Sequence, residues 1–484
     1  MRKFYPINSM NNQLFINGCW EPSESGQTFV TLDPSTEEAI CEVARGTAKD
    51  VDLAVHAAEK ALHGPWQQLS PASRGELLYS LAELIQTNRI ELARMETRDV
   101  GKPLKISLGD IDGVVATLRY NAGASDKMQG DTIPLGVDFV DFTLLEPIGV
   151  TAHIVPWNFP LGMVIRSLAP ALAAGCTAVL KPAEQSPLST LWLAELIKEV
   201  GFPDGVVNVI TGYGEEAGAA LVKHPGVNGV TFTGSVATGR KVSVSAAATF
   251  KSTVLELGGK NPIIIFPDAD LERAADHAIE GAFENSGQVC SSISRFILHQ
   301  SIKDEFIERF KEKAAKLTIG NGLDDPDLGP LVSKEQYDKV MQHIAAAKEK
   351  GARLCFGGGR PTHLEHGYFI EPTLFDQVDP STPLAYEETF GPVASVVTFE
   401  SEDEALSIAN KLDYGLVAGL YTRDINRALN FIRRLECGSV WINGWFIGGV
   451  QAPTGGVKDS GIGRERGLAG VHNYLRIKNV GIRL

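Results

Sequence analysis

The chain has 484 residues, more than one hydrophobic core usually supports, so we expect two or three domains. Its formal net charge of −14 gives an acidic surface, which argues against binding nucleic acid or an anionic membrane. The chain start (1–18) lacks the apolar core of a signal peptide, and the longest nearly apolar run (168–180) is too short to span a bilayer.

The six cysteines are scattered along the sequence, at positions 19, 41, 176, 290, 355 and 437. None falls in a Cys-x-x-Cys or Cys/His spacing, so we predict neither a metal site nor a disulfide framework. This cysteine usage is typical of a reduced, cytoplasmic enzyme.

The first section begins with a short strand in "QLFING" and a turn, followed by helical patterns over 48–62 and 73–101. From residue 150, short β-rich runs alternate with helical patterns, which predicts a parallel sheet covered on both faces. The predicted strands of this sheet are 150–155, 177–181, 206–210, 229–233 and 252–259. The predicted helices between them are 161–174, 187–200, 215–223 and 236–248.

A second α/β unit follows, with a strand at 262–266, a helix from about 270 to 285 and a last strand in "GSVWING" (438–444). Two further strand-like stretches, 138–147 and 472–484, belong to neither unit. A strand at a chain end can lie at the edge of its own subunit's sheet or extend the sheet of a neighbouring subunit. The sequence leaves both possibilities open.

Polar residues or glycines stand directly after most strands of the first predicted sheet, or at their ends. They are Asn158, Lys181, Glu184, Gly234, Ser235, Gly239 and Glu256, in chain order. Because ligands of parallel α/β sheets bind at the carboxyl ends of the strands, this clustering predicts a site at one sheet edge. Glu256 ends an otherwise apolar strand, where a carboxylate is either a paired structural acid or a functional base.

Two glycine-rich motifs compete as the binding site of a nucleotide. "GYGEEAG" (212–218) has the spacing of a dinucleotide fingerprint, but its Glu215 and Glu216 would repel a pyrophosphate, so we interpret it as a turn. "FTGSVATGRK" has no acid nearby, and its backbone N–H groups and the Ser235 hydroxyl could hold a phosphate at a helix N-terminus. The alternative for this motif is an ordinary strand-to-helix turn.

"FENSGQVCSSISR" (283–295) contains Cys290, which taken alone is a small buried hydrophobe or a reactive thiol. If the two α/β units face each other, this loop can place the thiol over the strand ends of the first sheet. Asn158 would then supply a donor for a developing oxyanion, and Glu256 a base for water. Together with a nucleotide site, these groups suggest oxidation through a thioester.

These motifs resemble those of the NAD(P)-dependent aldehyde dehydrogenase superfamily over nearly the whole chain. The motifs, in the family's order, are "PWNFP", "KPAE", "FTGS", "LELGGK", "SGQVC", "EETFGPV", "GSVWIN" and "GGVKDSGIGRE". The resemblance implies that Cys290 attacks the aldehyde to form a thiohemiacetal and then a thioester. It also implies that Asn158 and the Cys290 backbone N–H hold the oxyanion, and that Glu256 activates the hydrolytic water.

The resemblance implies a bound NAD. Lys181 and Glu184 match contacts to the adenosine ribose, Gly234 and Ser235 the pyrophosphate site, and Glu388 and Phe390 the nicotinamide-ribose side; Trp157 of "PWNFP" joins them. An acid at 184 would accept from a free 2′-hydroxyl and repel a 2′-phosphate, so NAD is favoured and NADP is the weaker alternative.

The fold implied by the resemblance is α/β, with a Rossmann-like cofactor domain, an α/β catalytic domain and a small β oligomerisation element. The expected limits are 1–124 and 148–257 for the first, 258–456 for the second, and 125–147 with 469–484 for the third. The last element favours a homodimer or homotetramer.

The sequence departs from the family at positions that bear on the substrate. Arg166 stands where many relatives carry tryptophan; semialdehyde-oxidising members have an arginine there that grips the substrate carboxylate, and some aromatic-aldehyde members also have one. Glu284 could neutralise Arg166 or bind a cationic group. Thr454 replaces a bulky residue of the family. Further candidates for the lining of an apolar substrate channel are Phe159, Phe283, Trp445 and Phe446.

We therefore predict oxidation of an aromatic or carboxylate-bearing aldehyde, with a betaine aldehyde or aminoaldehyde as the alternative. A CoA-acylating dehydrogenase is a different possibility, but that class typically lacks a base at position 256. A non-catalytic structural protein with this fold is a third, and the complete set of Cys290, Glu256 and Asn158 argues against it.

Overall fold

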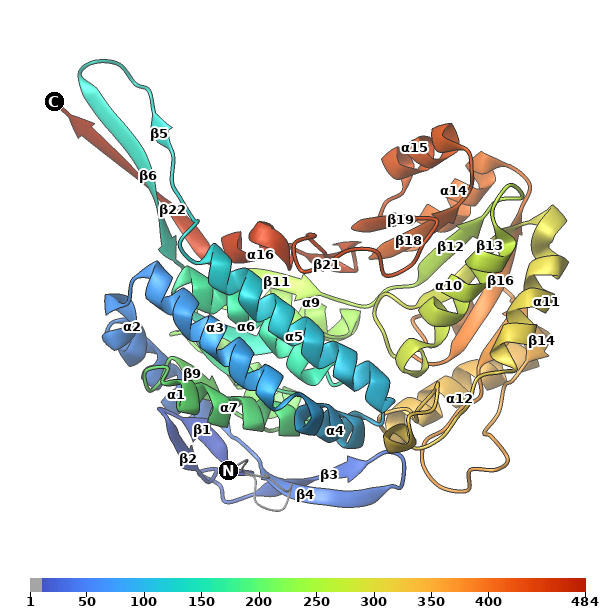
Figure 1. The fold of residues 1–484 in the computed structure, drawn as a ribbon, viewed down its shortest axis with the longest axis horizontal. Helices are drawn as coiled ribbons and strands as arrows, with labels where there is room; N and C mark the ends of the chain where they lie inside the picture. The colour runs from blue at the N-terminus through green and yellow to red at the C-terminus, as the bar shows by residue number, and fades with distance from the viewer. Residues whose placement is uncertain (1–10) are drawn as a thin grey trace.

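The computed structural model describes residues 11–484; residues 1–10, part of the stretch compared with a signal peptide and of the predicted cofactor domain, lie outside the described range. In this range the chain forms two α/β lobes, and a β ribbon projects from one of them (Figure 1). The predicted α/β class is confirmed. The domain limits predicted from the sequence stay a proposal.

The first lobe is built on an eight-stranded sheet. In spatial order its strands are β2 (Cys19–Glu21), β1 (Leu14–Ile16), β9 (Val207–Val209), β8 (Thr177–Lys181), β7 (Val150–Ile154), β10 (Gly229–Thr233), β11 (Ser252–Glu256) and β21 (Gly461–Ile462). The five strands from β9 to β11 run parallel, and β1 and β21 pair antiparallel with their neighbours at the two edges.

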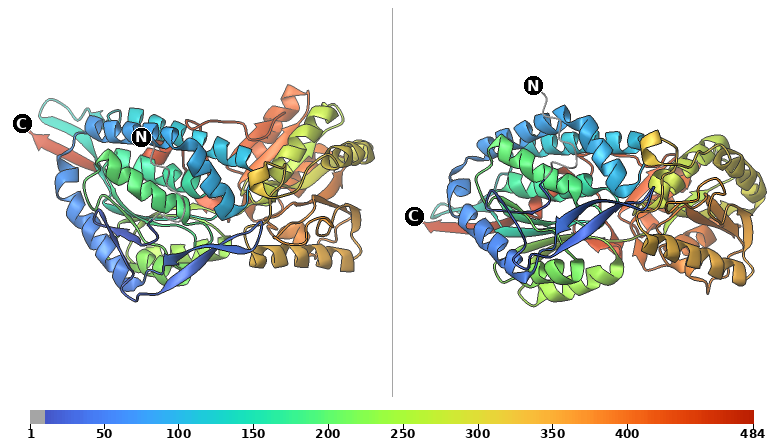
Figure 2. Two further views of the ribbon diagram at one scale, coloured as in Figure 1. Left: turned by 60° about the horizontal axis from the view of Figure 1, so that its bottom comes forward. Right: turned by 90° about the horizontal axis from the view of Figure 1, so that it is seen from below.

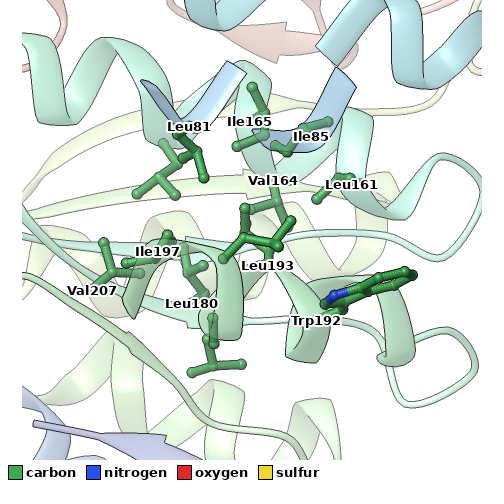
Figure 3. Packing of buried hydrophobic residues seen from close by; sticks show 14 of the residues in the cluster. Leu81, Ile85, Leu161, Val164, Ile165, Leu180, Trp192, Leu193, Ile197 and Val207 are labelled. Carbon is green, nitrogen blue, oxygen red and sulfur yellow. The ribbon is translucent and has the colours of Figure 1, made fainter. Parts of the chain in front are cut away.

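Helices cover both faces of this sheet. They are α1 (Ala48–Leu62), α2 (Pro65–Gln68), α3 (Pro71–Thr87), α4 (Arg89–Val100), α5 (Leu104–Ala124), α6 (Pro160–Ala174), α7 (Leu188–Val200), α8 (Ala219–Lys223) and α9 (Val236–Ala247). On β8, Ala178 and Leu180 face the core formed with α3, α5, α6 and α7, and Val179 faces the core formed with α1 and α8. Figure 3 shows the first of these cores, in which Leu180 and Val207 meet helix residues such as Leu193.

The second lobe contains a seven-stranded sheet with the order β14 (Arg353–Phe356), β15 (Thr373–Asp376), β16 (Val393–Phe399), β13 (Ile293–His299), β12 (Asn261–Ile265), β18 (Val417–Tyr421) and β19 (Ser439–Ile442). Its longer helices are α10 (Leu271–Phe283), α11 (Lys303–Ala314), α12 (Lys334–Glu349), α14 (Glu402–Asn410) and α15 (Ile425–Arg434). Short elements complete it: α13 (Pro383–Tyr386) and the pair β17 (Tyr414–Gly415) and β20 (Val457–Lys458).

The two leftover strands of the sequence pair with each other. β6 (Phe139–Pro147) and β22 (Leu475–Arg483) run antiparallel along their whole length, and the short β5 (Thr132–Ile133) joins β6. This ribbon extends away from the body of the protein, and the helix α16 (Gly467–His472) lies at its base (Figures 1 and 2). Several large apolar side chains on it are exposed, among them Phe139 (44%) and Ile477 (74%).

The structure corrects the predicted helix over 73–101, which is two helices that meet at Asn88. The Asn88 Nδ2 donates to the Leu84 carbonyl (2.8 Å), and the Asn88 backbone leaves the helical region. The predicted turn at 212–218 is also different, because Gly214–Gly218 forms a π-helical turn that continues into α8. The sequence prediction missed α5 and the hairpin of β3 (Thr28–Asp33) and β4 (Glu38–Ala44).

The β3–β4 hairpin connects the lobes, since the Tyr368 N–H donates to the Pro34 carbonyl (3.1 Å) and the Gly367 N–H to Glu37 (2.9 Å). No helix within residues 11–484 is both long and apolar enough to cross a membrane.

Candidate active site

Cys290 lies in the loop between a short 3₁₀ turn (Glu284–Gly287) and β13. Asn285 and Ser286 of that turn have positive φ angles (47° and 57°), a conformation that residues other than glycine adopt only when their surroundings hold them. Two bonds from the Asn261 side chain fix the loop on its other side: its Nδ2 donates to the carbonyls of Cys290 (2.8 Å) and Ser292 (2.9 Å). The thiol is thus carried by a rigid segment.

Asn158 follows β7 and is only 3% exposed. Its Nδ2 donates one hydrogen to the Gln288 carbonyl (2.8 Å), two residues before the thiol. An amide nitrogen carries two hydrogens, so the second stays available, and the Oδ1 atom has no hydrogen-bond partner. The bond to Gln288 therefore joins the predicted oxyanion donor to the loop that carries Cys290.

Glu256 ends β11 and is 4% exposed, and its Oε1 atom has no hydrogen-bond partner. Burial, together with the negative charge of Glu465, raises the pKa of Glu256 to about 8. The positive charges of Arg166, Arg464 and Arg466 oppose this rise. A carboxyl with a pKa in this range can exchange a proton with water near neutral pH.

A cavity of about 160 Å³ joins these groups and opens between the lobes. The predicted site residues in its lining are Trp157, Asn158, Gly234, Ser235, Glu256, Cys290, Glu388 and Phe390. Because they come from both lobes, the expectation that the loop of the second lobe covers the strand ends of the first is confirmed. Burial raises the pKa of the Cys290 thiol to about 11, and the charge of Arg166 acts in the opposite direction.

The predicted phosphate motif forms the start of α9, where Ser235 is the capping residue and its Oγ accepts from the Thr238 N–H (3.3 Å). No acidic side chain stands in the first turn of α9. In the competing motif, the Arg45 Nε donates to Glu216 (2.8 Å) and closes the turn. The interpretation of 212–218 as a motif that does not bind the nucleotide agrees with this geometry.

Of the other predicted cofactor residues, Trp157, Glu388 and Phe390 line the cavity, and Lys181 and Glu184 do not. Lys181, which ends β8, donates to the Glu184 Oε2 (3.0 Å), and burial lowers its pKa. Glu388 accepts from the Gly259 N–H (2.9 Å), and burial raises the pKa of Glu388 to about 7. The rings of Trp157 and Phe390 meet edge to face, with centroids 5.3 Å apart.

Arg166 does not pair with Glu284. Its guanidinium forms an ion pair with Glu465, which precedes α16, and the two side chains are only 10% and 4% exposed. Glu284 lines a separate cavity of about 530 Å³ together with Asp110, Glu280 and Lys105, and burial raises its pKa to about 7.

The remaining substrate candidates are not in the lining of the Cys290 cavity. Phe159 packs under the Lys102 ammonium, 5.1 Å from the ring centroid. Trp445 and Phe446 form an aromatic group with Trp441, and the Trp445 Nε1 donates to the Ser291 carbonyl (3.2 Å), next to the thiol.

Sequence reasoning missed other residues that line the cavity, chiefly Met163, Gln336 and Lys339. The Gln336 Nε2 donates to the Phe390 carbonyl (2.7 Å) and the Lys339 Nζ to the Glu388 carbonyl (3.1 Å). These bonds hold the "EETFGPV" segment against α12. No sequence signal marks these two residues, because α12 resembles any other amphipathic helix. Met163 belongs to α6, directly after "PWNFP", where its position could have indicated it.

Fold and site together define a two-lobed α/β enzyme with a thiol, an amide and a buried carboxyl around one cavity. The sequence model described as "Aldehyde dehydrogenase family" matches residues 20–480. The chain belongs to the aldehyde dehydrogenase family and is an oxidoreductase that acts on aldehydes.

Its relatives and structural neighbours are similar over nearly their whole lengths. A hydroxyisobutyraldehyde dehydrogenase of Mycolicibacterium austroafricanum is 46% identical, covering 97% of this chain and 94% of the relative. The NAD+ complex of an aldehyde dehydrogenase from Bacillus cereus has a TM-score of 0.97 at 42% identity, covering 100% and 99% of the two chains. A betaine aldehyde dehydrogenase from Staphylococcus aureus in complex with NAD+ has a TM-score of 0.96 at 40% identity, covering 98% and 95%.

Proposed function

We propose that this protein oxidises an aromatic aldehyde to its carboxylic acid with NAD, through a thioester on Cys290. The observation that carries the proposal is the convergence of Cys290, Asn158 and Glu256 on one cavity, where the amide and the carboxyl each keep an unpaired polar atom. Unpaired buried polar atoms are rare in folded proteins and cost free energy, so they are typical of groups that bind a substrate or an intermediate.

The residues around the cavity suit a dinucleotide. The start of α9 offers backbone N–H groups and the Ser235 hydroxyl without a nearby acid, which fits a pyrophosphate. Glu388 and Glu184 are carboxylates able to accept from ribose hydroxyls, and the charge at 184 favours NAD over NADP. The neighbours solved with NAD+ support the same assignment.

The chain's own groups account for the covalent steps. The Cys290 thiol gives up its proton to water, the Sγ adds to the aldehyde carbon, and the oxyanion that forms accepts from the Asn158 Nδ2 and the Cys290 backbone N–H. NAD, when bound, supplies the acceptor of the hydride whose loss leaves an acyl group on the Cys290 sulfur. Glu256 then takes a proton from a water molecule while the water oxygen attacks the thioester carbon. The bond from that carbon to the Cys290 sulfur breaks, and the acid is released.

The aromatic substrate is favoured because Arg166 is committed to Glu465 and does not line the cavity. A carboxylate-bearing aldehyde would have to compete with Glu465 for the guanidinium. Trp441, Trp445 and Phe446 do not line the cavity, but Trp445 donates to the carbonyl of Ser291, the residue after the thiol. An aromatic group so close to the Cys290 loop supports a flat apolar substrate.

Betaine aldehyde or an aminoaldehyde is the second candidate. Glu284, which lines the separate acidic cavity, supports it, because a carboxylate attracts a cationic group. The neighbour described as a betaine aldehyde dehydrogenase supports it as well.

We also propose that the chain forms a homodimer or homotetramer through the β6–β22 ribbon and acts in the cytoplasm. The exposed apolar side chains of the ribbon support an interface with a second copy. Light scattering on the full chain and on an Ile477→Asp variant tests the oligomer: a lower mass is expected for the variant, and an unchanged mass would exclude this interface.

The test of the activity is NADH formation by the purified protein with a panel of aldehydes. The panel contains benzaldehyde, succinate semialdehyde, betaine aldehyde and hydroxyisobutyraldehyde, each also with NADP. The highest kcat/KM is expected for benzaldehyde with NAD. A preference for betaine aldehyde would replace the aromatic substrate by the second candidate, and turnover only with added CoA would contradict hydrolysis through Glu256.

A further inference from the structure

A third cavity, of about 500 Å³, lies at the base of the β6–β22 ribbon. Its lining comes chiefly from the first helices of the chain, α1 to α3, from the end of β6 and from the start of β22. Within residues 11–484, it shares no lining residue with the Cys290 cavity. A volume of this size suits a small molecule, so the cavity can hold a ligand of its own.

The charges in this lining do not balance. Arg74, Arg476 and Lys478 contribute three positive charges, and Glu146 is the one carboxylate among the lining residues. Glu146 forms ion pairs with Arg476 (3.3 Å) and with Lys478, so a single negative charge is shared between two cations. With His63 neutral, two positive charges are left over, in a chain whose formal net charge is −14.

Arg74 has no carboxylate partner in the part of the chain that the structure describes. Its Nη1 and Nη2 atoms donate to the carbonyls of Leu69 (3.1 Å) and Ala173 (3.4 Å), and its Nε is buried without a partner. Burial lowers the pKa of its guanidinium. Because a cation that is partly withdrawn from water and lacks a counter-charge costs free energy, an anion bound in the cavity would stabilise it.

The three cations keep hydrogens that their contacts within the described range do not use. A guanidinium carries five N–H hydrogens and an ammonium three. Arg476 and Lys478 each direct one hydrogen to Glu146, and each Arg74 Nη atom directs one to a carbonyl. Donors therefore remain on three side chains that line one cavity. This arrangement suits a tetrahedral phosphate, whose oxygens lie in more than one plane, better than a planar carboxylate.

The cavity also has an apolar side, and its cations lie away from the proposed oligomer contact. Leu62 and Ile148, both half-buried, belong to the lining, so a ligand with an apolar body can pack beside its anionic group. Arg476 and Lys478 lie on the same face of β22, and Ile477 between them points to the other face because side chains alternate along a strand. An interface through Ile477 therefore leaves the cations accessible.

We propose that this cavity is a binding site for a small phosphate monoester. Arg74, Arg476 and Lys478 hold the phosphate dianion, and the apolar side of the cavity contacts the body of the ligand. Glu146 limits the affinity, because its carboxylate competes with the phosphate for two of the cations. The site is separate from the chemistry at Cys290 and does not depend on the proposed function.

Isothermal titration calorimetry on the full chain, saturated with NAD, tests the site with inorganic phosphate and with phenyl phosphate. Saturation with NAD occupies the predicted pyrophosphate site at the start of α9, so neither probe can bind there. Titration at pH 8 keeps both probes mainly dianionic, and a low ionic strength preserves the electrostatic attraction.

Four variants change the charge of the lining. Arg74→Gln, Arg476→Gln and Lys478→Gln each remove one cation, and the Kd for phenyl phosphate should rise by about tenfold in each. Glu146→Gln removes the competing carboxylate, so the Kd should fall. Arg309→Gln, at an arginine on α11 in the other lobe, is the matched control and should leave the Kd unchanged.

The two ribbon variants decide the matter if Arg74→Gln does not fold, because the side chains of Arg476 and Lys478 are 63% and 54% exposed. Unchanged Kd values in Arg476→Gln and Lys478→Gln would overturn the proposal. A lower mass of these variants in light scattering, together with weaker binding, would assign this face to an interface between copies and would also overturn it.

The two probes separate the monoester from other phosphate sources. Phenyl phosphate is expected to bind more tightly than inorganic phosphate, because its ring reaches the apolar side of the cavity. Equal or weaker binding of phenyl phosphate would exclude the monoester. Loss of all binding on saturation with NAD would place the phosphate in the cofactor site and would contradict a separate cavity.

Discussion

Two buried polar clusters adjoin the "PWNFP" segment, one at Phe159 and one at Asn158, and they differ in how completely their hydrogen bonds are made. In the first, the Lys102 Nζ donates to Glu96 (2.7 Å) and Asp110 (2.6 Å), and the Glu96 Oε1 accepts from the Leu161 N–H (2.8 Å) and the Ser189 hydroxyl (3.0 Å). In the second, Asn158 and Glu256 each keep an oxygen without a partner.

This difference in hydrogen bonding distinguishes a cluster that stabilises the fold from one that can react with a substrate. Lys102 and Glu96 are completely buried, yet each charged end is neutralised and hydrogen-bonded, as a structural ion cluster must be. Glu256 is also buried, and the nearby negative charge of Glu465 disfavours its ionised form. A purely structural site would not retain such a repulsion. The cluster with incomplete bonding is therefore the one available to a substrate.

The largest expected effect is on the reactive cluster. Cys290→Ala should lower the rate of NADH formation by about 10³-fold or more, because no other group can carry the acyl intermediate. The midpoint of thermal unfolding should change little. Cys19→Ala, at an exposed cysteine on β2, is the matched control and should keep full activity. Normal turnover by the Cys290→Ala protein would contradict this assignment, since the second cluster would then not carry the reaction.

The next effect is on the structural cluster. Lys102→Met leaves two carboxylates buried without their cation, so the free energy of unfolding should fall by about 3–5 kcal/mol. Urea unfolding at pH 8 measures it, and Lys105→Met, at an exposed lysine in the first turn of α5, is the control. A loss below about 1 kcal/mol would mean that the charges of this cluster are not needed for stability.

The last effect is on the free energy of unfolding, which the buried Glu256 carboxyl makes dependent on pH. Its folded-state pKa of about 8 lies above the unfolded value, so the folded protein binds more protons than the unfolded chain between about pH 4.5 and 8. The stability of the unmodified protein therefore falls as pH rises through this window.

Because glutamine does not titrate, Glu256→Gln should gain stability relative to the unmodified protein as the pH rises from 5 to 9. Urea unfolding at pH 5 and pH 9 gives the two differences. An equal difference at both pH values would show that Glu256 is not held neutral by the fold.

Much of the site could be predicted from the sequence because parallel strands end at a common edge. Asn158, Gly234 and Glu256 each follow or end a strand, and the topology alone brings them together. Cys290 required the further assumption that the lobes face each other, which the structure confirms.

Other features depend on contacts that no local pattern encodes. The partner of Arg166 is set by the way the chain returns to the first sheet as β21, so the sequence suggested Glu284 in place of Glu465. Gln336 and Lys339 reach the site from a helix whose pattern carries no catalytic signal. The break at Asn88 depends on one side-chain hydrogen bond within an otherwise continuous helical pattern. The β3–β4 hairpin was detectable in principle, since β3 alternates between buried and exposed residues.

If the incompletely bonded cluster of Cys290, Asn158 and Glu256 performs the reaction, the steady-state kcat of Glu256→Gln at pH 8 must be far below that of the unmodified protein. Each preparation should be normalised to folded protein by its unfolding transition. The kcat for benzaldehyde is expected to fall by about 10²-fold or more, while the protein is at least as stable as the unmodified chain. A kcat within a few-fold of the unmodified value would contradict it, because the buried carboxyl would then have no part in the chemistry.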